Sequence, residues 1–290
     1  MPSLPWILVC PSSRGIGHVL TRHLLLATSL PILATTRHGD PLATKAALLD
    51  GLPCSPSDAG SSSPPLSRRL TLVRCDVTDE SSIADAAAAA AELFPPATHH
   101  LHLACVLPGI LHAEKSPLRV DAERALESFR VNALGPLLLA KHFVGFLPRR
   151  ATNLGREEEE ALDGPATGAE LVARLPRHAT WLSVAARVGS TSDNRSGGWY
   201  SYRASKAAVI SLAKSLDHFL AARSGDKALA VAYHPGTVRT DLSRPFWSST
   251  AEGKLFEPVD AVDRLVRVLG ALEPRQRGRC WDWKGEEILP

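Results

Sequence analysis

Near its start the chain reads Trp6-Ile7-Leu8-Val9-Cys10-Pro11-Ser12-Ser13-Arg14-Gly15-Ile16-Gly17. The first five residues are all apolar, as is typical of a strand that is buried on both faces of a parallel sheet. A turn with two glycines follows, and a helix is expected to begin at Gly15. The stretch therefore predicts a strand, a tight turn and a helix in direct succession.

The same alternation continues along the chain. The apolar runs expected to form strands are Trp6–Cys10, Pro31–Thr36, Leu70–Arg74, Leu101–Cys105, Thr180–Val184 and Leu229–His234. The segments expected to form helices are Gly15–Thr28, Asp79–Phe94, Asp121–Leu147 with a bend at Pro136, Tyr200–Arg223 and Pro258–Leu272. Repeated strand–helix–strand order predicts an α/β fold with a doubly wound parallel sheet, a Rossmann fold, in one domain spanning residues 1–290.

Two segments interrupt this pattern. Residues 51–67 are rich in Ser, Pro and Gly, and residues 149–178 carry several Gly and Pro together with the acidic run Glu157–Glu160. Such compositions are typical of surface loops, so both are predicted to be insertions.

Composition excludes several classes of protein. The chain has 33 basic and 30 acidic side chains, a balance that favours neither nucleic acid nor a membrane surface as a partner. It has no run of about 18 apolar residues, and Met1–Cys10 lacks a basic segment, so a strand is expected there and not a signal peptide. The five cysteines include no C-x-x-C pair, which predicts no metal site or disulfide framework and a cytoplasmic location.

The turn at residues 11–17 has the features of a phosphate-binding loop. A helix N-terminus offers unpaired N–H groups and a positive dipole end, which suit a pyrophosphate. Gly15 and Gly17 would let the backbone approach a dinucleotide. After the second strand the chain has Arg37 and no acid for the ribose 2′-hydroxyl of NAD, so Arg37 and Arg14 favour the 2′-phosphate of NADP(H).

A second motif carries the chemistry. Tyr202 and Lys206 are four residues apart, which places them on one face of a helix. A phenol has a pKa of about 10, and a neighbouring ammonium lowers it. Tyr202 could then exchange a proton with a carbonyl oxygen while a hydride reaches or leaves the carbon. The pair predicts an oxidoreductase acting on a carbonyl or an alcohol.

Together these motifs resemble the short-chain dehydrogenase/reductase family, and Ala186–Ala208 resembles its C-factor-like branch. The resemblance implies that Tyr202, Lys206 and Asn132 are catalytic, with Asn132 holding a water in a proton relay. It implies that Asp76 lies beside the adenine, and that Val238 and Thr240 embrace the nicotinamide carboxamide. The cofactor-binding residues it implies are Ser12, Arg14, Gly15, Ile16, Gly17, Arg37, Asp76, Asn132, Tyr202, Lys206, Val238 and Thr240.

The sequence departs from the family pattern at three places. Pro11 stands where the first loop glycine is expected, and Val106-Leu107-Pro108-Gly109 replaces Asn-x-Ala-Gly. The family serine falls at Ala185 or Ala186, and losing such a donor typically lowers the rate by about 10²–10³. Ser183 and Ser190 are the two alternatives for its role.

Two functions follow from these features. One is an active NADP(H)-dependent carbonyl reductase or alcohol dehydrogenase, and the other is a catalytically weak NADP(H)-binding sensor or signalling protein. Phe246 and Trp247 predict an apolar or aromatic small-molecule substrate. Related folds pair through their long helices, so a homodimer or homotetramer is expected by analogy.

Overall fold

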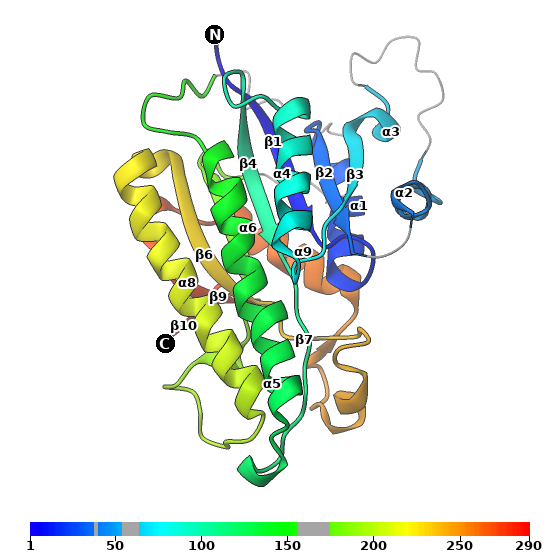
Figure 1. The fold of residues 1–290 in the computed structure, drawn as a ribbon, viewed down its shortest axis with the longest axis vertical. Coiled ribbons are helices and arrows are strands. Elements are labelled where there is room, and N and C mark those ends of the chain that lie inside the picture. The colour runs from blue at the N-terminus through cyan, green and yellow to red at the C-terminus, as the bar shows by residue number, and fades with distance from the viewer. Residues whose placement is uncertain (38–39, 54–63, 156–174) are drawn as a thin grey trace.

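A computed structural model describes residues 1–37, 40–53, 64–155 and 175–290. An eight-stranded sheet runs through the centre, with helices on both of its faces (Figure 1). Its strand order is β10-β9-β6-β5-β4-β1-β2-β3, and all neighbours are parallel except β10 and β9. This arrangement confirms the predicted doubly wound Rossmann fold.

The strands of this sheet are β1 (Leu4–Cys10), β2 (Ile32–Thr36), β3 (Leu70–Arg74), β4 (His99–Val106), β5 (Ala179–Val184), β6 (Ala228–His234), β9 (Cys280–Asp282) and β10 (Glu287–Ile288). Two further strands, β7 (Thr237–Val238) and β8 (Leu255–Phe256), pair with each other. The helices are α1 (Gly15–Ala27), α2 (Pro41–Leu49), α3 (Leu66–Arg69), α4 (Glu80–Leu93), α5 (Ala122–Phe129), α6 (Gly135–Phe143), α8 (Tyr200–Ser224) and α9 (Pro258–Gly270).

The sheet separates two hydrophobic cores. Ile7 and Val9 of β1 pack into the core beneath α1 and α9, whereas Trp6 and Leu8 pack into the core beneath α4, α6 and α8 (Figure 1). Successive strand residues point to opposite faces, and here both faces are covered. This is why the strand sequences are apolar throughout.

The predicted helix at 121–147 is present from Ala122 to Phe143, where the backbone stays right-handed helical throughout. It contains a π-helical turn over Arg130–Leu134, which separates α5 from α6. The irregularity therefore lies directly before Pro136, and not at Pro136 where the bend is predicted. A Cβ on Gly135 would lie only 2.9 Å from Val77, so a glycine is needed where α6 crosses the segment before α4.

The predicted insertions lie partly outside the described residues, because 54–63 and 156–174, with Glu157–Glu160, are not among them. Within the described ranges, no helix combines the length and the apolar character needed to cross a membrane.

Candidate active site

The predicted site residues lie mainly on segments that follow the strands at their carboxyl ends. The turn 11–17 follows β1, residues 107–112 follow β4, and residues 185–190 follow β5. The first turns of α8 bring Tyr202 and Lys206 to the same edge. In open parallel sheets, this edge is where ligands bind.

Lys206 is almost completely buried, at 2% exposure. Its Nζ donates a hydrogen bond to the carbonyl of Val184 at 2.8 Å and a longer one to that of Pro108 at 3.5 Å. The ammonium thus ties the ends of β4 and β5 to α8. Burial lowers the pKa of Lys206 to about 8, because the charged form loses its water.

Tyr202 is also buried, and its ring contacts the edge of Trp199 with ring centres 6.1 Å apart. Burial raises the pKa of Tyr202 to about 12, so the predicted lowering by Lys206 is wrong for this structure. The physical reason is that desolvation governs the phenol, while the Lys206 ammonium donates to backbone carbonyls. A neutral phenol is the form that can give a proton to a carbonyl oxygen.

Asn132 connects the loop after β4 with α8. It lies fully buried in the π-helical turn, where its Oδ1 accepts from the Ile110 N–H at 2.8 Å. Its Nδ2 donates to the Ile110 carbonyl at 2.9 Å and to Ser205 Oγ at 3.0 Å, and Ser205 in turn donates to the Tyr202 carbonyl. One Oδ1 lone pair is left for a further donor such as a water.

Gly109 lies beside both Lys206 and Asn132. A Cβ built on it would lie 3.6 Å from Lys206 Nζ and 3.9 Å from Asn132 Oδ1. The structure therefore brings Lys206 and Asn132 together beside a glycine whose missing side chain leaves room, and Tyr202 lies one helical turn before Lys206.

The turn after β1 fits an anion. Arg14, the N-cap of α1, gives the helix no side-chain hydrogen bond, and the first turn has no acidic residue. The N–H groups there are left for a ligand. A Cβ on Gly17 would lie 1.9 Å from the carbonyl oxygen of Pro11, so only glycine fits. Ile16 packs against the core beside α9.

Ser12 points away from such a ligand. It is fully buried, its hydroxyl donates to the Val9 carbonyl at 2.9 Å, and its N–H donates to the Thr35 carbonyl at 2.8 Å. Ser12 therefore fastens the turn to β1 and β2. The Cys10–Pro11 peptide bond is cis.

The two arginines predicted to bind the 2′-phosphate are both exposed. Arg14 follows β1 and Arg37 follows the adjacent parallel strand β2, so both belong to the same edge. Asp76 follows β3, and its Oδ1 accepts from the N–H and the hydroxyl of Thr78 at 2.9 and 2.8 Å. Asp76 thus shapes the turn that leads into α4.

The segment after β6 borders the turn after β1. Gly236 has φ +79°, and a Cβ there would lie 2.6 Å from the ring of Phe256, so this position requires glycine. Val238 is buried, and Thr240 Cγ2 lies 3.4 Å from the Cβ position of Gly15. The segment that carries Val238 and Thr240 therefore meets the turn after β1.

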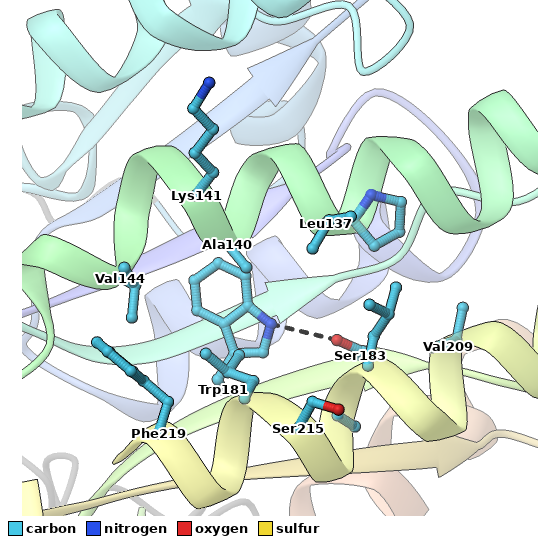
Figure 2. A pocket seen from close by; sticks show the side chains of 13 residues that line it. Leu137, Ala140, Lys141, Val144, Trp181, Ser183, Val209, Ser215 and Phe219 are labelled. Atoms are coloured by element: carbon cyan, nitrogen blue, oxygen red, sulfur yellow. Dashed lines mark hydrogen bonds between the residues drawn. The ribbon is translucent and has the colours of Figure 1, made fainter. Parts of the chain in front are cut away.

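Neither alternative for the family serine is directed at the tyrosine. Ser183 accepts from Trp181 Nε1 at 3.2 Å and faces an apolar hollow of about 330 Å³ between α6 and α8 (Figure 2). Ser190 donates to the Leu289 carbonyl and accepts from the Asp193 N–H at 3.0 Å. Both hydroxyls have partners elsewhere, and alanines occupy positions 185 and 186.

Of the predicted aromatic wall, Phe246 packs near the site and Trp247 is turned to Arg239. The Phe246 ring lies 4.9 Å from the ring of Trp199, which itself contacts Tyr202. Trp247 donates from Nε1 to Ser243 Oγ at 2.8 Å, and its ring lies 5.1 Å from the guanidinium of Arg239.

Sequence reasoning missed two charged residues beside the site. Glu114 is buried, and its carboxylate accepts hydrogen bonds from the hydroxyl and the N–H of Ser201. Arg187, directly after Ala186, donates to the buried Asp282 at 2.6 Å. Their partners are 87 and 95 positions away in the chain, so no local pattern indicates either contact.

Comparisons with known proteins identify relatives. C-signal of Myxococcus xanthus is 31% identical over 169 residues, which span 58% of this chain and 80% of that protein. The 1-hydroxy-2-glutathionyl-2-methyl-3-butene dehydrogenase of Rhodococcus sp. (strain AD45) is 40% identical over 96 residues, 33% of this chain and 40% of that protein. No family model matches the chain.

Solved structures share the fold over the whole chain. The NADPH-bound carbonyl reductase from chicken fatty liver superposes with a TM-score of 0.74 at 24% identity, covering 100% of this chain and 96% of that one. The carbonyl reductase Sniffer of D. melanogaster gives a TM-score of 0.72 at 18% identity, covering 100% of both chains.

Proposed function

Because the chain belongs to the short-chain dehydrogenase/reductase family, we propose that it is an NADP(H)-dependent oxidoreductase that reduces a carbonyl compound or oxidises an alcohol. The observation that carries this proposal is the grouping of Tyr202, Lys206 and Asn132 at the carboxyl edge of the sheet. A buried Tyr–Lys pair tied to an asparagine suits proton transfer at a carbonyl oxygen.

The residues present fit the cofactor. The uncapped N-terminus of α1 and the close approach allowed by Gly15 and Gly17 suit the pyrophosphate, with Ser12 and Ile16 holding the turn. Arg14 and Arg37 would bind the 2′-phosphate and Asp76 would lie beside the adenine. Val238 and Thr240 would hold the nicotinamide end. NADP(H), when bound, supplies or accepts the hydride.

The proton would move through Tyr202. In reduction, hydride forms the new C–H bond, the C=O π electrons move to oxygen, and Tyr202 gives that oxygen its proton. The phenolate left behind is stabilised by the Lys206 ammonium, which would also hold the ribose. Asn132 keeps the loop after β4 in place and would hold the water that returns a proton to the site. Oxidation follows the reverse course.

The substrate we propose is an apolar or aromatic carbonyl compound or alcohol. Trp199 contacts Tyr202, Phe246 packs against Trp199, and the two rings would form an apolar wall. The chemical setting we propose is the reducing cytoplasm, in which the buried thiols of Cys10, Cys75, Cys105 and Cys280 would stay free. Assembly as a homodimer or homotetramer remains a prediction.

A second candidate is a catalytically weak NADP(H)-binding protein with a sensor or signalling role. Two observations favour it: alanine occupies both positions expected for the family serine, and Ser183 and Ser190 are bonded elsewhere. The similarity to C-signal of Myxococcus xanthus is compatible with it.

The test is a titration with NADPH followed by nicotinamide fluorescence, and then a panel of aldehydes, ketones and quinones with NADPH consumption as the readout. Tyr202→Phe should lose activity by about 10³ or more. Tyr200→Phe is the matched control, because Tyr200 is 41% exposed on the same helix and should keep its activity. Tight NADPH binding without consumption favours the second candidate, and failure to bind NADPH or NADH contradicts both.

A further inference from the structure

A hollow of about 500 Å³ lies between α9 and the hairpin of β9 and β10. Its walls carry three cations, Arg264, Arg267 and Lys284, together with the indoles of Trp281 and Trp283. Among the described residues that line it there is no aspartate or glutamate. We call it the α9 hollow.

Arg264 is held in position by aromatic rings. Its guanidinium carbon lies 4.6 Å from the ring centre of Phe256 and 4.7 Å from that of Trp283. Such contacts fix a planar cation and leave its in-plane N–H donors available. In the described part of the chain, no acceptor takes a hydrogen bond from this guanidinium.

Of the other two cations, Arg267 comes from α9 and Lys284 comes from the turn between β9 and β10. Arg267 is three residues after Arg264, on the same face of α9, and is exposed. Lys284 comes from the hairpin turn, with its Nζ 5.2 Å from the Trp283 ring and 3.9 Å from the exposed Glu286. Three like charges facing one hollow repel one another, so an anion bound between them would be favoured.

A buried hydroxyl lies under the same helix. Tyr233 pairs in register with Trp281, so both side chains point to the α9 face of the sheet. The Tyr233 hydroxyl has no hydrogen-bond partner in the described part of the molecule. Burial and, next, the Asp282 carboxylate raise the pKa of Tyr233, and the Arg264 guanidinium lowers it, so the hydroxyl lies within electrostatic range of both charged groups.

We propose that the α9 hollow binds a small phosphate-type dianion, either free phosphate or the phosphate group of a larger metabolite. Two guanidinium groups and an ammonium present donors in several directions, which suits an anion with three or four oxygens and two charges better than a carboxylate. The residues that line the α9 hollow come from α9 and from the segment around β9, and none belongs to the turn after β1, although Trp283 shares an apolar cluster with Ile16 and Val238.

The experiment is calorimetric titration with inorganic phosphate and with glycerol 3-phosphate, at an ionic strength kept constant with sodium chloride. The protein carries Arg14→Gln and Arg37→Gln, which weaken phosphate binding at the cofactor site, and any phosphate that still binds the N–H groups at the start of α1 is unaffected by substitutions in the α9 hollow. We expect saturable binding of at least one of the two anions. Tighter binding of the ester points to a metabolite as the source, and tighter binding of inorganic phosphate points to the free ion.

Adding Arg267→Gln and Lys284→Gln should weaken this binding by about tenfold or more, since each charge-assisted hydrogen bond contributes on the order of 1.5–3 kcal/mol. Both side chains are exposed, so the fold should survive, and the midpoint of thermal unfolding checks this. Arg275→Gln is the matched control, because Arg275 is exposed nearby and paired with Glu273. The absence of saturable binding, or equal binding by the double variant and the control, overturns the proposal.

Discussion

The carboxylate of Glu114 accepts hydrogen bonds from both the N–H and the hydroxyl of Ser201, the residue immediately before Tyr202. Helix α8 starts without a cap of its own, because Trp199 is left-handed at φ 52° and gives no side-chain hydrogen bond. The Trp199 N–H donates to the Glu114 carbonyl at 2.6 Å. A loop residue far away in sequence thus sets where α8 begins.

Glu114→Ala should lower the free energy of unfolding by about 1–3 kcal/mol, because it removes the acceptors of a buried helix start. It should also lower kcat more than it raises KM, since Tyr202 would lose its fixed position. Glu114→Gln keeps one acceptor oxygen, so its free energy of unfolding and its kcat should lie between those of wild type and of Glu114→Ala. Glu127→Ala is the control, because Glu127 is exposed and paired with His112. Equal unfolding energies and kcat for Glu114→Ala and Glu127→Ala would contradict this role.

The titration of Lys206 predicts the pH dependence of the reaction. Its pKa is about 8, whereas that of Tyr202 is about 12, so the ammonium is the first of the two groups to lose a proton as pH rises. If the ammonium stabilises the phenolate, kcat/KM for reduction should fall as pH rises through about 8. The measurement is a pH–rate profile of wild type and of Lys214→Met, an exposed lysine on the same helix. A profile that stays flat to about pH 10 would exclude this role for Lys206.

The lowered pKa of Lys206 also predicts how the free energy of unfolding changes with pH. The pKa of Lys206 lies below its ordinary value of 10.5, so between about 8 and 10.5 the unfolded chain binds more protons. Stability therefore rises with pH through this window, as far as this group is concerned. Lys206→Met should stabilise the protein at pH 7 by about 1–2 kcal/mol, after the loss of the bond to Val184 is counted, and should lower activity. Urea unfolding of this variant and of Lys214→Met measures it, and a less stable Lys206→Met would refute it.

Restoring the family serine should raise activity. Ala185 and Ala186 are both buried, but Ala186 is not part of the apolar cluster of Ala185, Val209 and Ala213, so Ala186→Ser places its hydroxyl outside that cluster. The expected gain in kcat is about 10- to 100-fold. Ala185→Ser is the contrasting variant and should lower the unfolding temperature without the gain. If neither variant gains activity, the missing serine is not what limits the rate.

Arg14 and Arg37 should determine whether the protein prefers NADPH or NADH. Replacing Arg14 and Arg37 with Gln should raise the Kd for NADPH by about tenfold or more and leave the Kd for NADH nearly unchanged, because only NADPH carries the 2′-phosphate. Arg68→Gln, another exposed arginine, is the control. Equal losses of affinity for both cofactors would show that these side chains act through the fold.

Sequence alone predicts those features of the fold and the site that a local pattern of residues encodes. The apolar runs of β1 and β6 are long enough to be recognised, and the Tyr202–Lys206 spacing follows from the helix period. The strands β9 and β10 have three and two residues, too few for a pattern. The direction in which Lys206 points, the hydrogen bond of Ser190 to Leu289, and the contact of Glu114 with Ser201 all depend on segments that meet only in the folded chain.

The π-helical turn at Arg130–Leu134 has one further consequence. A π-turn holds one residue more than an α-helical turn, so it acts as a single-residue insertion. Deleting one residue from it would restore a continuous helix, but everything on one side of the deletion would rotate by about 100° relative to the other. Asn132 and Ser205 could then no longer meet while the flanking helices keep their packing. The contact between Asn132 and Ser205 therefore depends on the number of residues in this turn as much as on their identity.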